Sequence, residues 1–294
     1  MTSHFYPSLV IFLEGPRAKM TTLPLHGEVV ARNPFEDEIE SLNAMTKEWI
    51  QTQALRKLQP DTIAIECKYS PPTETDAADW HDRFYRDALS SRNNALTLLR
   101  LAHHGALTAR LVVMPGANMP HCGYSLANVS YLPALFHPEY AKKYPGIDSR
   151  AVDLFGKYWG KDLHKKSGVR WLSKAADEFY EEDRFVHLVV GLEQLLLRDE
   201  SERSYLSYKM ALRGAWLLGE ASGDRTVVFT RLRKAYTLRS KIAHGSSTGE
   251  LSATEKQLLL ELENDLRNLI LRALEPPSLF TAESLNQVVL GSAG

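Results

Sequence analysis

The sequence predicts a mainly helical protein in which an α+β domain, residues 1–148, precedes an all-helical domain, residues 149–275. In the first domain, short runs rich in β-branched and aromatic residues alternate with helical periodicity, whereas the second shows helical periodicity throughout. A polar stretch marked by proline and glycine, His137 to Gly146, fits a linker between them. Residues 276–294 begin with Pro276-Pro277 and are expected to form a flexible C-terminal tail.

The first domain is expected to contain strands and two helices. Its first helix should begin at Asn33 and Pro34, because asparagine is a favoured N-cap residue and proline is favoured at the first helical position. Acidic residues in the opening turn, which suit the positive end of the helix dipole, support the same start. We expect strands at Ser8–Glu14, Thr62–Tyr69 and Leu107–Met114, a further candidate strand at Tyr124–Leu132, and helices at Asn33–Leu58 and Asp76–His104.

The second domain is expected to be a bundle of helices. In its last helix, Leu258, Leu262 and Leu266 recur on one face, which is the apolar stripe of a helix that packs against a bundle. Short connections between helices of similar length favour antiparallel neighbours. The expected helices are Val169–Glu181, Asp183–Arg198, Ser201–Glu220, Arg225–Ala243 and Ser252–Leu274.

The composition favours a cytoplasmic protein. With 294 residues, 44% of them hydrophobic and 24% charged, the chain can bury one large core or two modest ones. Cys67 and Cys122 offer neither a disulfide framework nor metal-ligand spacing, which suits a reducing compartment. The apolar run from Leu9 to Leu13 is too short to cross a membrane. We therefore expect no membrane partner, no metal and no other cofactor.

The charge of the chain is balanced overall but not locally. A formal net charge of −1 excludes a globally basic nucleic-acid binder. Between Arg225 and Ser247, however, there are six lysines and arginines and no acid. A basic run of this kind can bind an anionic partner, although it is more commonly a solvated helix face.

One arginine in this run lies on the apolar face of its predicted helix. Arg239 falls seven residues after Leu232 and three after Tyr236, on the stripe that should face the core. Burying an unpaired guanidinium costs several kcal/mol, so the fold should supply a carboxylate or a bound anion. Gly245 is expected to end the helix in the left-handed conformation, which leaves His244 at the rim of the last turn.

The stretch from Tyr236 to Gly245, written Tyr-x-x-Arg-Ser-x-x-x-His-Gly, resembles the R-x4–6-H motif of the HEPN ribonucleases, in the form found in their Apea-like branch. The likeness extends upstream to a helix that opens with Asp183-Arg184-Phe185 and contains Glu193, and to a second helix that carries Arg213. It covers roughly residues 168–275. Although Arg and His at this spacing are common by chance, the ordered helices and the terminal His-Gly make the match more specific.

The resemblance implies a HEPN-type helical bundle that acts as a metal-independent endoribonuclease. In that family two protomers place their motifs in a shared cleft, and cleavage leaves a 2′,3′-cyclic phosphate. His244 would then be the acid or base, and Arg239 would stabilise the phosphate and the transition state. The supporting residues would be Ser240, Glu193, Arg213 and Tyr236, with Glu193 as the carboxylate that holds Arg239 or Arg213. The RNA-binding residues would be Arg231, Arg233, Lys234 and Lys241.

The chemistry of RNA cleavage agrees with this assignment. RNA supplies its own nucleophile, the 2′-hydroxyl, so the enzyme needs proton transfer and positive charge at phosphorus rather than a metal. Residues five apart on a helix diverge by about 140°, so Arg239 and His244 of one chain should not converge on one phosphate. In a homodimer, by contrast, the arginine of one chain and the histidine of the other could reach the same phosphate. Because many HEPN proteins are toxins or phage-defence effectors, the expected partners also include an antitoxin or a regulatory protein.

Three alternatives remain open. Arg239 could be a structural arginine locked to Glu193, with His244 as a cap for the last helical carbonyls. A HEPN bundle could also serve as a catalytically inactive RNA-binding or dimerisation module. Finally, Asp61, Glu66 and Lys68 are similar to the acids and the Glu-x-Lys element of PD-(D/E)xK nucleases, which bind Mg²⁺. Asp61, however, is too close in the sequence to Glu66 to sit on the preceding strand of a hairpin.

Overall fold

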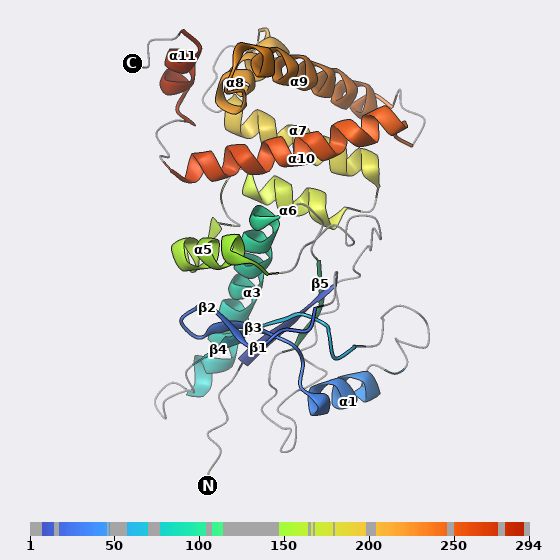
Figure 1. Cartoon of the computed structure of the whole chain (residues 1–294), viewed down its shortest axis with the longest axis vertical. Coiled ribbons are helices and arrows are strands. Elements are labelled where there is room, and N and C mark those ends of the chain that lie inside the picture. The colour runs from blue at the N-terminus through green and yellow to red at the C-terminus, as the bar shows by residue number, and fades with distance from the viewer. Residues whose placement is uncertain are drawn as a thin grey trace. The chain divides into compact units, whose positions relative to one another are not determined.

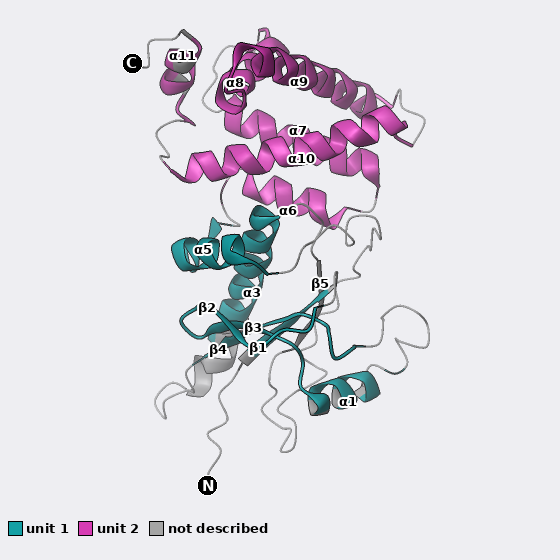
Figure 2. Ribbon diagram, in the orientation of Figure 1, with its two compact units in different colours: residues 1–163 teal, residues 164–294 magenta. Residues whose placement is uncertain are grey.

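In the part of the chain that the structure describes, the protein is mainly helical and contains an antiparallel sheet, which agrees with the mainly helical class predicted (Figure 1). The computed structural model describes residues 8–14, 18–45, 47, 58–69, 77–103, 108–113, 147–163, 166, 168–178, 180–197, 204–245, 250–275 and 280–290. The chain divides into two compact units, residues 1–163 and residues 164–294 (Figure 2). The candidate strand at Tyr124–Leu132 and the expected linker at His137–Gly146 lie outside the described residues.

The sheet of the first unit has the strand order β2-β3-β4-β1-β5, and every neighbouring pair is antiparallel. The central strand β1 pairs with β4 and β5, so that Val10 lies opposite Glu66 on one side and Val113 on the other. The three predicted strands are present, and the short hairpin formed by β2 and β3 was not predicted. The strands are β1 (Ser8–Glu14), β2 (Leu23–His26), β3 (Val29–Arg32), β4 (Ala64–Lys68) and β5 (Thr108–Val113).

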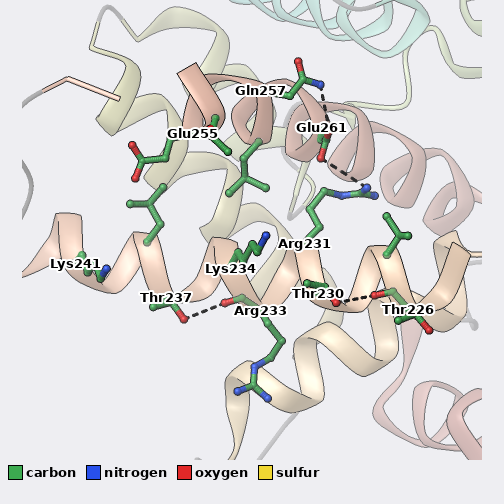
Figure 3. A pocket seen from close by; sticks show the side chains of 14 residues that line it. Thr226, Thr230, Arg231, Arg233, Lys234, Thr237, Lys241, Glu255, Gln257 and Glu261 are labelled. Carbon is green, nitrogen blue, oxygen red and sulfur yellow. Dashed lines mark hydrogen bonds and ion pairs between the residues drawn. The ribbon is translucent and has the colours of Figure 1, made fainter. Parts of the chain in front are cut away.

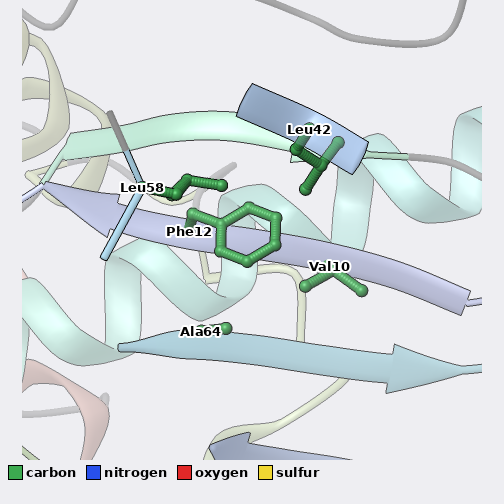
Figure 4. Close-up of a cluster of buried hydrophobic side chains, with 5 residues drawn as sticks. All are labelled: Val10, Phe12, Leu42, Leu58 and Ala64. Atoms are coloured by element: carbon green, nitrogen blue, oxygen red, sulfur yellow. The ribbon is translucent and has the colours of Figure 1, made fainter. Parts of the chain in front are cut away.

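Both faces of β1 are buried. Side chains alternate along a strand, so Val10 and Phe12 face one side while Leu9 and Ile11 face the other, and all four are fully buried. On the first side, Val10 and Phe12 pack with Ala64 of β4, with Leu58 and with Leu42 of helix α1 (Glu36–Met45) in one apolar cluster (Figure 4). Helix α3 (Ala77–Ala102) contacts β1 and β5. A nearly continuous apolar run is the sequence pattern that such a two-sided burial requires.

The first helix begins later than predicted because Asn33 is used elsewhere. Its side-chain amide donates to the carbonyls of Ala18 and Thr62, and its Oδ1 accepts from Met20, at 2.8 to 2.9 Å. Helix α1 instead starts at Glu36, and the carboxylate of Glu38 accepts a hydrogen bond from the backbone N–H of Phe35 at 2.8 Å. Asn33 therefore ties three segments together rather than capping a helix.

The division between the units lies further along the chain than the sequence predicted. Helix α5 (Ser149–Tyr158), which we had not predicted, contacts α3 and β2 and so belongs to the first unit. Its N-cap residue Asp148 accepts from the N–H of Ala151 and lies 2.8 Å from Nε2 of His103.

Among the described residues, no helix combines the length and the apolar character needed to cross a membrane.

The second unit is helical throughout its described part, as predicted. Its most extensive contact between described elements joins α8 and α9, which lie side by side (Figure 1). Gly214 permits this approach, because a Cβ atom at that position would lie 2.2 Å from Cδ1 of Leu232 on α9. The helices are α6 (Val169–Asp177), α7 (Glu181–Leu196), α8 (Leu206–Leu218), α9 (Ser222–Ala243), α10 (Ala253–Leu274) and α11 (Ala282–Leu290).

Helix α11 lies in the segment that was expected to be a flexible tail. It contacts α8, and Asn286 of α11 accepts a hydrogen bond from Nη2 of Arg213 at 2.7 Å. The side chain of Leu285 is almost fully buried. These contacts anchor the helix to the second unit.

Candidate active site

Helix α9 carries both candidate catalytic residues near its C-terminus. The helix ends as predicted: Gly245 has a φ of +67°, and its N–H donates to the carbonyl of Ile242 at 3.0 Å. The N–H of His244 donates to the carbonyl of Ser240 at 3.1 Å. His244 is the C-cap residue, and its side chain is exposed to solvent. The local geometry thus leaves the imidazole at the open end of the helix.

Arg239 continues the buried stripe of α9. Val228, Leu232 and Ala235 on this stripe are buried, and Arg239 follows four residues after Ala235, one helical turn further along. Its Nη2 lies 3.8 Å from Oε2 of Glu193 on helix α7. The predicted carboxylate is therefore present, and it faces Arg239.

The contact between Arg239 and Glu193 is loose. A separation of 3.8 Å is within the range of an ion pair but too long for a hydrogen bond. The side chain of Arg239 remains 32% exposed, and its Nε is buried without a hydrogen-bond acceptor among the described residues. Burial raises the pKa of Glu193, and the positive charge of Arg239 opposes that shift. The guanidinium therefore keeps hydrogen-bond donors that a further acceptor could use.

The imidazole of His244 also has no partner within the described part of the chain, because neither a hydrogen bond nor an ion pair engages it. Backbone groups close the end of α9, so this side chain is not needed as the cap. By helix geometry, Arg239 and His244 point about 140° apart. Arg239 faces α7, while His244 faces solvent, so one protomer does not bring them together.

The remaining supporting residues have different surroundings. Arg213 is buried in α8, and it donates from Nη1 to the carbonyl of Leu196 at 2.8 Å and from Nη2 to Asn286. These bonds give Arg213 a structural role. Ser240 and Tyr236 are both half-buried on α9. Of the two arginines proposed as partners of Glu193, Arg239 is the one that forms an ion pair with it.

The four predicted RNA-binding residues line one groove between α9 and α10, with a volume of about 750 Å³ (Figure 3). Arg231 is not available there, because Nε and Nη2 both lie 2.8 Å from the carboxylate oxygens of Asp265. Arg233, Lys234 and Lys241 are exposed. The groove residues are Thr226, Val227, Thr230, Arg231, Arg233, Lys234, Thr237, Leu238 and Lys241 on α9, and Thr254, Glu255, Gln257, Leu258 and Glu261 on α10.

Sequence analysis missed most of this groove. The recurrence of Thr226, Thr230 and Thr237 on one face of α9 was a usable signal, since residues three, four and seven apart share a face. Asp265 left no such signal, because it is 34 residues from its partner Arg231 and lies on another helix.

The competing metal-nuclease interpretation loses its central carboxylate. Oε2 of Glu66 lies 2.7 Å from Nε of Arg32, and the same guanidinium forms two 2.7 Å bonds with Glu38. Glu66 is thus committed to an ion pair on the sheet, and Lys68 is exposed at the end of β4.

No family model, no curated protein and no solved structure matches the chain. Any functional assignment therefore depends on the side chains of α7, α9 and α10, and on the motif that Arg239 and His244 form at the end of α9.

Proposed function

We propose that the protein is a metal-independent endoribonuclease of the HEPN type, in which Arg239 and His244 act on RNA across a homodimer. The observation that carries the proposal is the state of these two side chains. Arg239 has only a 3.8 Å ion pair with Glu193, and His244 has no side-chain partner within the described residues. A structural arginine and a capping histidine would both be engaged more tightly.

The reaction needs proton transfer at the sugar and charge neutralisation at phosphorus. His244 takes the proton of the 2′-hydroxyl, whose oxygen then forms a bond to phosphorus and completes the cyclic phosphate. The bond to the 5′-oxygen breaks, and that oxygen takes a proton from solvent. Arg239 donates to the phosphate oxygens, whose negative charge grows in the pentacoordinate transition state.

A second copy of the chain completes the site. Since Arg239 and His244 diverge by about 140° along α9, each scissile phosphate draws its arginine from one protomer and its histidine from the other. In this proposal Glu193 orients Arg239 through their ion pair. The alternative of an inactive RNA-binding module would retain RNA affinity and dimerisation without cleavage.

The test is the cleavage of single-stranded RNA in excess EDTA by the full chain, with His244→Ala as the control. We expect wild type to cleave RNA, to leave 2′,3′-cyclic phosphate ends, and to spare both DNA and RNA with 2′-O-methyl groups. A requirement for a divalent ion, or cleavage of DNA, would contradict the mechanism. RNA binding without any cleavage would favour the inactive module.

The proposal extends to the biological role of a toxin or antiviral defence effector in the cytoplasm, which an antitoxin or regulatory partner would restrain. Expression of wild type should slow the growth of a bacterial host, and expression of His244→Ala at the same level should not. Equal growth inhibition by the two proteins would count against a nuclease toxin.

A further inference from the structure

The lining of the groove between α9 and α10 extends along α9 as far as Lys241, three residues before the C-cap residue His244. Lys234 and Lys241 are seven residues apart, which places them two helical turns or about 10 Å apart along the axis. His244 follows three residues after Lys241, about 4.5 Å further along. Figure 3 shows Lys234 extending from α9 into the space beside α10. A ligand that extends past Lys241 along α9 would therefore come within one helical turn of His244.

The charges in the groove are unevenly satisfied. Both carboxylates of the groove, Glu255 and Glu261 on α10, have partners. Glu255 accepts from the N–H and the Oγ of Ser252 at 2.8 and 2.7 Å, and Glu261 accepts from Gln257 at 3.1 Å and lies 3.8 Å from Arg231. Lys234 and Lys241, by contrast, form no ion pair in the described part of the chain. Lys241 is still close enough to Glu255 to act on it: hydrogen bonds from Ser252 and the charge of Lys241 both lower the pKa of that carboxyl. The unneutralised charge in the groove is positive, so it is complementary to an anion.

Other residues of the lining are apolar or offer hydrogen-bond acceptors. Val227 on α9 is 61% exposed, and Leu238 and Leu258 also line the groove. The hydroxyls of Thr230 and Thr237 donate to the carbonyls of Thr226 and Arg233 at 2.9 and 3.0 Å. Because each hydroxyl has a single proton, these oxygens face the groove only as acceptors.

We propose that this groove binds one strand of RNA, with phosphates at Lys234 and Lys241 and bases against the apolar residues. The choice of RNA rests on the proposed ribonuclease function. A single strand fits because its unstacked bases can contact Val227, Leu238 and Leu258, whereas a duplex conceals the base faces. The threonine oxygens accept from ribose 2′-hydroxyls, a donor that DNA lacks. An RNA strand bound in the groove would thus extend toward His244.

The test measures RNA binding in the His244→Ala background of the full chain, which keeps the probe intact. The probe is a mixed-sequence single-stranded RNA oligonucleotide, and the variant is Lys234→Gln with Lys241→Gln. Loss of two phosphate contacts should reduce the salt slope of the affinity by about 1.4, which corresponds to roughly 25-fold weaker binding at 0.1 M salt if binding is equal at 1 M. The matched control removes two exposed charges of the same unit, with Arg170→Gln and Arg272→Gln, and should bind as the parent does.

A second variant tests the apolar lining without changing the core. Val227→Glu, at an exposed position, should weaken binding of single-stranded RNA while its melting temperature stays unchanged. Single-stranded RNA should also bind more tightly than DNA of the same sequence or than duplex RNA. Tighter binding of the duplex, or equal loss of affinity in the control variant, would overturn the proposal.

Two further outcomes separate this inference from others. If the lysine variant binds RNA as its parent does but converts a dimer to a monomer, the groove is an interface between two copies and the proposal is wrong. If wild type fails to cleave RNA while the lysine variant still loses RNA affinity, the groove assignment stands and the proposed nuclease function fails.

Discussion

Arg32 in the first unit and Arg239 in the second each lie beside a glutamate, and the contrast between them is informative. In the first unit, the side chain of Arg32 is 4% exposed and forms three 2.7 Å bonds, two to Glu38 and one to Glu66. In the second unit, the side chain of Arg239 is 32% exposed and has one 3.8 Å ion pair, to Glu193. A buried guanidinium requires full pairing, and the fold provides it for Arg32.

The difference fits a structural role for Arg32 and the phosphate-binding role that we propose for Arg239. Arg32 joins β3, α1 and β4, and all its charge is used to hold them together. Arg239 lies between α9 and α7 with donors left over, at a place where a phosphate could add to or replace the contact with Glu193. Loose pairing is what a group that must bind substrate needs, because a fully satisfied guanidinium gains little from a new anion.

The largest effect on stability is expected where pairing is tightest. Glu38→Ala leaves Arg32 buried without its two-bond partner, so the free energy of unfolding should fall by about 3 to 5 kcal/mol. Urea denaturation would measure it. The control is Glu40→Ala, at an exposed position of the same helix, which should stay within about 0.5 kcal/mol of wild type. If the Glu38 variant were as stable as wild type, the tight pairing of Arg32 would not be structural, and the contrast with Arg239 would fail.

A smaller loss of stability is expected at Arg231, whose side chain is more exposed than that of Arg32 and more tightly paired than that of Arg239. Asp265→Ala removes both 2.8 Å bonds to that guanidinium and should cost about 1.5 to 3 kcal/mol. Glu261→Ala is the matched control, since its carboxylate lies 3.8 Å from the same arginine and is 41% exposed. That variant should change stability by less than about 1 kcal/mol. A larger loss in the control than in Asp265→Ala would show that distance does not rank these pairs.

At Glu193 the expected change is small and depends on pH. Burial raises the pKa of Glu193, so its contribution to stability is present at acidic pH and is lost as the pH rises through the raised value. Glu193→Gln cannot ionise, so its stability relative to wild type should improve between acidic and neutral pH, with a difference below about 1 kcal/mol at pH 7. Unfolding curves at both pH values test this. A wild type more stable than the variant by several kcal/mol at pH 7 would indicate a tight structural pair.

The smallest effect on folding is expected at His244. Its exposed imidazole has no partner in the described part of the chain, so His244→Ala should alter the free energy of unfolding by less than about 0.5 kcal/mol. Cleavage of RNA should nevertheless fall by roughly 10²- to 10⁴-fold, the usual contribution of an acid–base group. A stable variant with wild-type cleavage would exclude His244 from catalysis.

The sequence predicted elements with strong local signals and missed those with weak ones. Strand β1 was predicted with its observed bounds, and α10 was predicted to within one residue from its leucine stripe. In the structure, Ser252 and Glu255 form a capping box at the start of that helix. The β2–β3 hairpin was missed because its strands are short and Pro24 argues against a strand. Proline is tolerated there because β2 is an edge strand.

The candidate site was predictable only where burial itself required a partner. The position of Arg239 on an apolar stripe demanded a carboxylate, and Glu193 on the apolar side of another helix could supply it. Periodicity does not fix how two helices are rotated against each other. The bond between Arg231 and Asp265, and the groove beside it, could therefore not be inferred from the chain.

The central claim is that Arg239 of one protomer and His244 of another act on one phosphate. Arg239→Ala and His244→Ala proteins, each inactive alone, are mixed in equal amounts, unfolded and refolded together, and assayed for RNA cleavage in EDTA. Half of the dimers then contain both variants, and each has one intact site of two, so up to about a quarter of wild-type activity should return. No recovery, in a mixture shown to contain the mixed dimer, would contradict the shared site.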